Sequence, residues 1–244
     1  MSADSDKAGP QAPGESGDPA VLAAANQALV WVQDGMSVGL GSGRASRAFI
    51  RLLGGRVREE GWKIKGVPTS EESGRLAKEF GIPLIDLDET TILDLTVDGA
   101  DEVGPGNDLI KGWGNALVRE RIVASASKRQ VILVGPEKIV PAIGARGKIP
   151  IEIIPLSRGP VVRKLKALGL SSQVRLANGV PRLTDNGNLT LDCAPPHTLD
   201  PQQARAMEAA LLAIAGVVDT GLFLGTAAAV IVGYPDGRVD IVKT

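Results

Sequence analysis

The chain has 244 residues, of which 43% are hydrophobic and 23% are charged, a composition typical of a globular protein with one large or two unequal domains. The 27 basic and 28 acidic residues leave a formal net charge of −1, and only 3% of residues are aromatic. These values argue against a nucleic-acid partner, which would need a basic surface or stacking aromatic side chains. A single cysteine, Cys193, cannot form an intramolecular disulfide, and a single histidine, His197, argues against a zinc site or a histidine-based triad.

Residues 1–19 are rich in Ser, Ala, Gly, Pro and Asp and are predicted to be a disordered tail. They lack the basic start and apolar stretch of a secretory signal. The apolar run at 20–32 is too short to span a bilayer and contains Asn26 and Gln27. We therefore expect a cytoplasmic protein that does not associate with membranes.

Strands and helices alternate from residue 20 to residue 143. In chain order we predict a helix at 20–33, a strand at 37–40, a helix at 45–53, a strand at 63–67, a helix at 71–80, strands at 83–87 and 92–97, a helix at 115–128 and a strand at 130–134. This alternation predicts an α/β fold with a Rossmann-like, mostly parallel sheet covered by helices. Ligands of such sheets bind beyond the carboxyl ends of the strands, so residues 41–46, 68–70 and 98–102 are expected to be neighbours.

The pattern changes after residue 143. We predict a strand at 149–154, a helix at 157–168, strands at 173–177 and 189–193, a helix at 201–214 and a strand at 217–223. The order β-α-β-β-α-β is that of a smaller ferredoxin-like α+β domain. Strands at 229–232 and 239–242 are expected to return to the first domain. The predicted domains are therefore 20–143 with 229–244, and 144–228.

Glu120 is the residue whose surroundings indicate catalysis most directly. On a helix its neighbours three and four positions away are Ala116, Leu117, Val123 and Ala124, all apolar. Burial on such a stripe raises the pKa of a carboxyl group, as catalytic carboxylates require. The same pattern also fits an inward glutamate that is paired with a distant Lys or Arg.

Two further groups of polar residues precede Glu120. Asp98-Gly99-Ala100-Asp101-Glu102 follows a predicted strand, and Gly99 permits a turn that directs both aspartates into one cavity. Glu102 is expected to be solvated or to cap a helix. Lys111, between Leu109-Ile110 and a glycine-flanked turn, either stabilises a developing oxyanion or is a surface loop residue.

The segment Gly41-Ser42-Gly43-Arg44-Ala45-Ser46 is a glycine turn that opens a helix. Its N–H groups and the helix dipole favour an anion such as phosphate. No Gly-Lys-Ser/Thr follows, and Ser46 stands where a dinucleotide fingerprint has glycine. The sequence therefore argues against a nucleoside triphosphate or NAD site.

Six segments together resemble the ribose-5-phosphate isomerase A family, which interconverts ribose 5-phosphate and ribulose 5-phosphate in the non-oxidative branch of the pentose phosphate pathway. The resemblance extends from about residue 31 to residue 243. The segments that carry it are Val97–Val103, Leu109–Gly112, Arg119-Glu120, Pro150–Pro155, Thr184–Asn188 and Gly216–Phe223.

The resemblance implies a role for each matching residue. Glu120 would be the general base between carbon 1 and carbon 2, Asp98 and Asp101 would hold or relay protons, and Lys111 would stabilise the enediolate. Substrate contacts are implied for Ser42, Gly43, Arg44, Ala45, Asp98, Gly99, Ala100, Asp101, Lys111, Gly112, Trp113, Gly114 and Lys138. The resemblance implies a sugar phosphate as small-molecule partner, no metal, no organic cofactor, and a homodimer or a dimer of dimers.

The chain departs from the family at the phosphate loop, which commonly reads Gly-Thr-Gly-Ser-Thr. Here Arg44 and Ala45 replace the two hydroxyl residues at its end, and Arg44 either binds phosphate bidentately or points to solvent. Trp113 and Asn115 stand where small residues are usual, and Val21 lies near the place of a common lysine. Affinity and exact sugar specificity are therefore open.

Two alternatives from other classes remain. A sugar-phosphate sensor can share this fold, although it would need an output module for which the tail before residue 20 is too short. The second alternative is an NAD enzyme on a Rossmann sheet. Failure to bind a nucleotide affinity column would exclude it.

Overall fold

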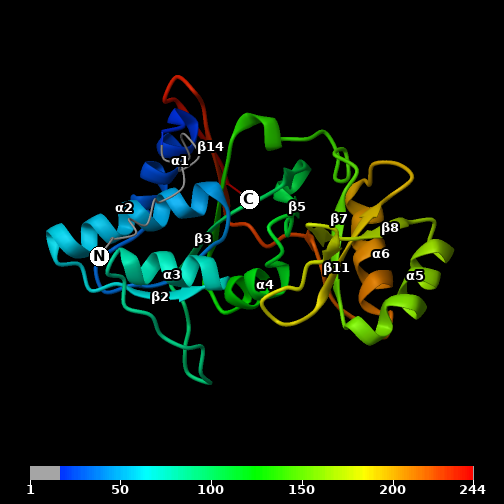
Figure 1. The fold of residues 1–244 in the computed structure, drawn as a ribbon. Coiled ribbons are helices and arrows are strands. Elements are labelled where there is room, and N and C mark those ends of the chain that lie inside the picture. Colours follow the sequence, from blue (N-terminus) through cyan, green and yellow to red (C-terminus); the bar gives the residue numbers. More distant parts are fainter. Residues whose placement is uncertain (1–16, 244) are drawn as a thin grey trace, which may run out of the picture.

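The computed structural model describes residues 17–243, and its central feature is a six-stranded sheet with the order β15-β14-β6-β3-β1-β2 (Figure 1). Neighbouring strands are parallel, except that β15 is antiparallel to β14. The predicted α/β fold class is confirmed. The strands are β1 (Ser37–Leu40), β2 (Lys65–Pro68), β3 (Leu95–Gly99), β6 (Gln130–Val134), β14 (Ala229–Gly233) and β15 (Val239–Lys243).

Helices cover the two faces of this sheet. The helices of the large sheet are α1 (Pro19–Leu29), α2 (Arg44–Glu60), α3 (Glu71–Glu79) and α4 (Leu117–Ser125). Because side chains alternate along a strand, Val131 and Leu133 of β6 pack with α1, α2 and α3 in one core, whereas Ile132 and Val134 pack with Leu117 of α4 in another. The predicted coverage of both faces is therefore confirmed.

The start of α1 corrects the boundary of the predicted tail. Residues 1–16 lie outside the described residues. Asp18, however, caps α1 by accepting a hydrogen bond from the Ala20 N–H, and Pro19 is in the first turn. The helix therefore begins before residue 20.

The predicted end of the second helix at residue 53 is wrong. Helix α2 continues through Gly54-Gly55 to Glu60 and ends at Gly61, whose φ of 72° is left-handed. A Cβ on Gly54 would lie 2.5 Å from the Cβ of Phe80, so this glycine lets two helices approach closely and does not end one.

Several short strands also differ from the prediction. In the predicted strand at 83–87 only Leu84 makes a β-bridge, to Gly66, and β3 begins at Leu95 rather than at residue 92. The predicted strand at 217–223 divides into β12 (Val217–Thr220) and β13 (Leu222–Phe223), which join different sheets. Tertiary pairing, which local patterns do not report, decides these boundaries.

The smaller domain has the predicted ferredoxin-like topology. Its antiparallel sheet has the order β12-β7-β11-β8, with two helices packed against it. Cys193 is buried in β11 as a free thiol. We propose domain boundaries near residues 143 and 228. The remaining elements of this domain are β7 (Ile149–Ile153), α5 (Arg158–Ala167), β8 (Ser171–Val174), β11 (Leu189–Ala194) and α6 (Pro201–Leu212).

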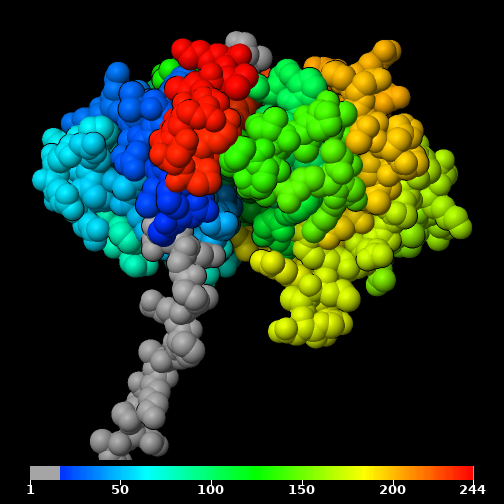
Figure 2. Space-filling model, turned by 90° about the horizontal axis from the view of Figure 1, so that it is seen from above, coloured from blue at the N-terminus to red at the C-terminus, as the bar shows by residue number. Residues whose placement is uncertain are grey.

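The chain also forms two small sheets outside the two main ones. One has the order β13-β5-β4, and the other pairs β9 with β10. Figure 2 shows the C-terminal strands (red) against the N-terminal helix (blue), in agreement with the contacts between α1 and β14. No helix within residues 17–243 has both the length and the apolar character needed to cross a membrane. The short elements are β4 (Glu102–Val103), β5 (Leu109–Ile110), β9 (Leu176–Ala177), β10 (Val180–Pro181), η1 (Pro105–Asn107), η2 (Pro136–Lys138) and η3 (Pro155–Ser157).

Candidate functional site

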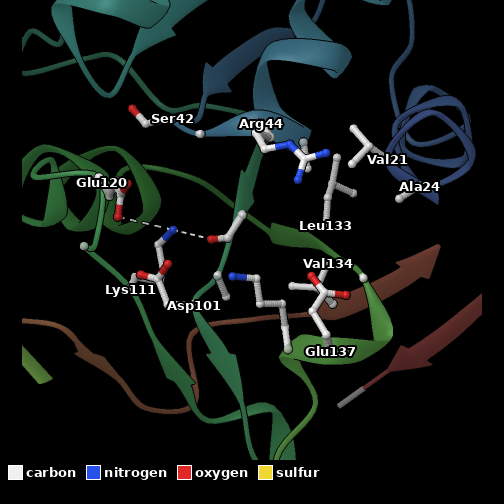
Figure 3. Close-up of a pocket in the computed structure, with 18 residues that line it drawn as sticks. Val21, Ala24, Ser42, Arg44, Asp101, Lys111, Glu120, Leu133, Val134 and Glu137 are labelled. Carbon is white, nitrogen blue, oxygen red and sulfur yellow. Dashed lines mark hydrogen bonds and ion pairs between the residues drawn. The ribbon is translucent and has the colours of Figure 1, made fainter. Parts of the chain in front are cut away.

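A cavity of about 270 Å³ opens beyond the carboxyl ends of β1, β3 and β6, the edge at which ligands of parallel sheets bind (Figure 3). Its size suits a small metabolite. Eleven of the predicted substrate contacts line it, whereas Asp98 and Trp113 do not. The predicted residues in its wall are Ser42, Gly43, Arg44, Ala45, Gly99, Ala100, Asp101, Lys111, Gly112, Gly114 and Lys138.

Lys111 and Glu120 meet in the wall of this cavity (Figure 3). Nζ of Lys111 lies 3.3 Å from Oε2 of Glu120 and 2.8 Å from Oδ2 of Asp98. Lys111 is 2% exposed, so it is not the surface loop residue that its sequence position also allowed, and Glu120 is 4% exposed. Glu120 is an inward glutamate that is paired with a lysine outside its own helix, nine residues earlier in the chain, and its carboxyl group also lines the cavity.

Burial sets the protonation of this pair. Loss of hydration raises the pKa of Glu120 from 4.5 to about 8, because the attraction of Lys111 opposes burial only in part while Asp98 and Asp101 add repulsion. For Lys111, burial alone would lower the pKa, but Asp98 and Glu120 together raise it above its usual value. The site therefore holds a permanent cation beside a carboxyl group that titrates near neutral pH.

Asp98 lies behind Lys111, at the end of β3. It is fully buried, and its Oδ1 accepts hydrogen bonds from the backbone N–H of Ser42 at 2.9 Å and from the hydroxyl of Ser46 at 3.1 Å. The carboxylate thus joins the lysine to the loop that opens α2. The expected proximity of residues 41–46 and 98–102 is confirmed.

Asp101 lies on the cavity surface. Its Oδ2 accepts a hydrogen bond from the backbone N–H of Trp113 at 2.9 Å, which fixes the turn after β5. Burial raises the pKa of Asp101, and this hydrogen bond and nearby cations oppose the rise. The Trp113 ring lies outside the cavity lining. The cationic groups of Arg146, Lys148 and Lys138 lie 4.8, 5.0 and 5.8 Å from its centroid.

The glycine turn at residues 41–46 forms another part of the wall. Gly43 caps α2 with φ of 89°, a conformation that favours glycine. The Ser42 hydroxyl lies 2.8 Å from the hydroxyls of both Thr69 and Ser70, so residues 68–70 are neighbours as expected. Arg44 lines the cavity, and its guanidinium donates to Asp18 at 2.8 Å.

Sequence reasoning missed part of the wall. Val21 and Ala24 of α1 line the cavity, as do the residues that follow β6, including Glu137. Because β6 is parallel to β3, its carboxyl end necessarily lies at the same edge, and this rule could have identified residues 135–137. An apolar residue such as Ala24 carries no comparable signal, and Val21 was notable only as lying near the place of a lysine common in the family.

The expectation that Glu102 is solvated is wrong. Its side chain is fully buried and accepts hydrogen bonds from the backbone N–H groups of Gly144 at 2.7 Å and Arg146 at 2.8 Å. The carboxylate therefore fixes the segment that leads into the small domain. The signal was absent from its sequence neighbours because both partners are more than forty residues away.

His197 is exposed and does not contribute to the cavity. Within the described residues no group of three or more His, Cys, Asp or Glu side chains is placed to hold a metal ion.

Comparison with known proteins places this chain in a family. Residues 65–237 match the model of the family described as ribose 5-phosphate isomerase A (phosphoriboisomerase A). The chain belongs to the ribose 5-phosphate isomerase A family. The predicted enzyme class, an isomerase of phosphorylated pentoses, is thereby confirmed.

Relatives of this isomerase family match nearly the whole chain. Ribose-5-phosphate isomerase A 1 of Oceanobacillus iheyensis is 42% identical, covering 88% of this chain and 94% of its own. Ribose-5-phosphate isomerase A of Sinorhizobium fredii is 44% identical, with the same coverage of both chains.

Solved structures of the family share the fold. The isomerase of Methanocaldococcus jannaschii is 38% identical with a TM-score of 0.86, covering 92% of this chain and 98% of its own. A D-ribose-5-phosphate isomerase in complex with phospho-erythronic acid is 36% identical with the same TM-score, covering 92% of this chain and 97% of its own.

Proposed function

We propose that the chain interconverts ribose 5-phosphate and ribulose 5-phosphate through an enediolate, with Glu120 as general base and Lys111 as stabilising cation. The single observation that carries the proposal is the pair of buried side chains in the cavity wall, a carboxylate and an ammonium 3.3 Å apart. Proton abstraction beside a carbonyl needs a poised base and a positive charge at the developing oxyanion.

The reaction begins with ribose 5-phosphate as the open-chain aldehyde. The Glu120 carboxylate takes the proton from carbon 2, and the electron pair moves through the new carbon–carbon double bond to oxygen 1. The Lys111 ammonium stabilises the negative charge there. Glu120 then returns the same proton to carbon 1, and oxygen 2 becomes the carbonyl of ribulose 5-phosphate as its hydroxyl proton is transferred to oxygen 1.

The hydroxyl proton must also move from oxygen 2 to oxygen 1. Asp101 supports this role because it lines the cavity and its raised pKa allows it to hold a proton transiently. Asp98 does not reach the cavity lining, so it acts through Lys111, which it holds at 2.8 Å, and through the Ser42 loop.

The phosphate end of the substrate fits the opposite side of the cavity. The N-terminus of α2 presents backbone N–H groups at residues 43–45 and the positive end of a 17-residue helix. Arg44 and Lys138 also line this cavity and provide the positive charge that a phosphate dianion requires.

The base assignment is tested with Glu120→Gln, which keeps size and removes the ionisable group. We expect turnover in a coupled assay to fall by about two to four orders of magnitude, while ribose 5-phosphate still binds in calorimetry. Glu137→Gln is the matched control, because Glu137 also lines the cavity without contacting Lys111 through any described ion pair. Near-normal turnover by Glu120→Gln would reject the assignment.

We further propose that the enzyme works in the cytoplasm as a homodimer or a dimer of dimers. Large apolar side chains exposed on the small domain support assembly, among them Leu156, which is 93% exposed, and Val180, which is 61% exposed. Light scattering tests the state directly, and a monomer at micromolar concentration would contradict the proposal.

A further inference from the structure

Three cations line the cavity, and they are not equally available to a phosphate. Lys111 is buried and engaged with Asp98 and Glu120. Helix α1 contributes only apolar side chains to the described wall, Val21 and Ala24. Arg44 and Lys138 are left to bind the phosphate group of the proposed substrate.

Arg44 is held by a residue outside the cavity lining. Its Nη2 donates to Oδ2 of Asp18 at 2.8 Å, although the Arg44 side chain is 54% exposed. A solvated arginine samples many rotamers, and fixing it in one of them costs conformational entropy. The contact with Asp18 therefore selects one direction for a side chain that would otherwise be free to leave the cavity.

Asp18 is itself fixed by the start of α1. Its Oδ1 accepts a hydrogen bond from the Ala20 N–H at 3.0 Å, so one carboxylate caps the helix and holds Arg44 at once. In Figure 3 the Arg44 side chain lies beside Val21 of α1, on the opposite side of the cavity from Lys111. The guanidinium has five N–H groups, so the contact with Asp18 leaves donors for a phosphate.

We propose that Asp18 is a positioning residue for substrate binding, which holds the Arg44 guanidinium over the cavity so that it meets the phosphate of the sugar. The proposal rests on the proposed function, because it assigns the phosphate end of the same substrate. Asp18 itself does not touch the substrate and acts through Arg44 alone.

The test uses Asp18→Asn in the full chain. Asparagine caps a helix as well as aspartate, so α1 is retained, but an amide that accepts from Ala20 presents an N–H group toward Arg44 and cannot hold it. The expected result is a rise of roughly two- to fivefold in KM for ribose 5-phosphate and in Kd for inorganic phosphate, with kcat within twofold.

A double-mutant cycle separates positioning from a general effect on α1. Arg44→Gln alone is expected to weaken phosphate binding by roughly 10- to 100-fold, as for loss of a charged hydrogen bond. In that background Asp18→Asn should have no further effect, since its action passes through Arg44. Glu60→Gln is the matched control, because Glu60 pairs with Arg56 of the same helix, outside the cavity lining.

Two results would overturn the proposal. One is an unchanged or tighter Kd for phosphate in Asp18→Asn, which would make the carboxylate a spectator or a competitor of phosphate. The other is an equal loss in the Arg44→Gln background. Calorimetry with inorganic phosphate needs no turnover, so this test stands even if Glu120→Gln shows that the base assignment is wrong.

Discussion

Oε2 of Glu120 lies 3.3 Å from Nζ of Lys111. The two residues belong to different elements, because Glu120 is in α4 and Lys111 is in the turn after β5. The glutamate pKa is nevertheless raised to about 8, because desolvation exceeds the attraction of the ammonium group. A carboxyl group with a pKa this close to the working pH suits a proton shuttle, because it can both accept and release a proton.

The pH dependence of the isomerase should follow Glu120. The base form is lost as pH falls through about 8, so kcat/KM should decline below that pH rather than near 4.5. Asp101→Asn should move this acidic limb to lower pH, because the charge of Asp101 contributes to the raised pKa. Initial rates with excess coupling enzyme measure both profiles, and a limb near pH 4–5 in the unmodified enzyme would contradict the expectation.

The free energy of unfolding should also depend on the titration of Glu120, but it should fall as pH rises, whereas activity should increase. A carboxyl group whose folded pKa is raised contributes stability below its unfolded pKa, near 4.5, and that contribution is lost as pH rises through about 8. Glu120→Gln cannot ionise, so its melting temperature relative to the parent should increase between pH 4.5 and 8.5. Thermal unfolding in matched buffers measures the difference, and a constant difference would show that Glu120 titrates normally in the fold.

Replacement of Lys111 by methionine should affect both activity and stability. The change leaves the Asp98 carboxylate buried without its cation, which destabilises a fold by about 3–5 kcal/mol. Loss of oxyanion stabilisation should lower kcat by about 10²–10³. Urea denaturation and the coupled assay measure the two effects.

The control for this variant is Lys128→Met. Lys128 also lies 2.8 Å from an aspartate, Asp94, but its side chain is 62% exposed, so the expected loss is at most about 1 kcal/mol. The double variant Asp98→Asn with Lys111→Met should regain stability without activity. Equal losses of unfolding free energy in Lys111→Met and Lys128→Met would contradict the prediction, because burial of Lys111 would then make no difference to stability.

The close approach of Gly41 to Asp98 predicts a severe effect of Gly41→Ala. A Cβ at residue 41 would lie 2.2 Å from Oδ1 and 2.6 Å from Cα of Asp98, so the strand or the loop must move. We expect a loss of about 1–3 kcal/mol in the free energy of unfolding and at least roughly tenfold weaker phosphate binding. Gly55→Ala in α2 is the control, since its Cβ meets nothing within 4 Å and should be neutral or stabilising.

Local patterns in the sequence were enough to identify the α/β class, the ferredoxin-like order and the buried face of α4. Periodicity reports which side of an element is apolar, and the four apolar neighbours of Glu120 therefore predicted its burial. The parallel sheet rule brought residues 41–46, 68–70 and 98–102 to one edge, because the carboxyl ends of parallel strands coincide.

Partners that are distant in the chain were decided by the tertiary structure alone. Periodicity states that a face is buried but not which side chain meets it, so the placement of Lys111 between Asp98 and Glu120 could not be read from spacing. For the same reason Glu102 is buried by partners beyond residue 143, and Arg44 is turned toward Asp18. Long polar side chains have many rotamers and no local preference for a partner, and only the packed fold selects among them.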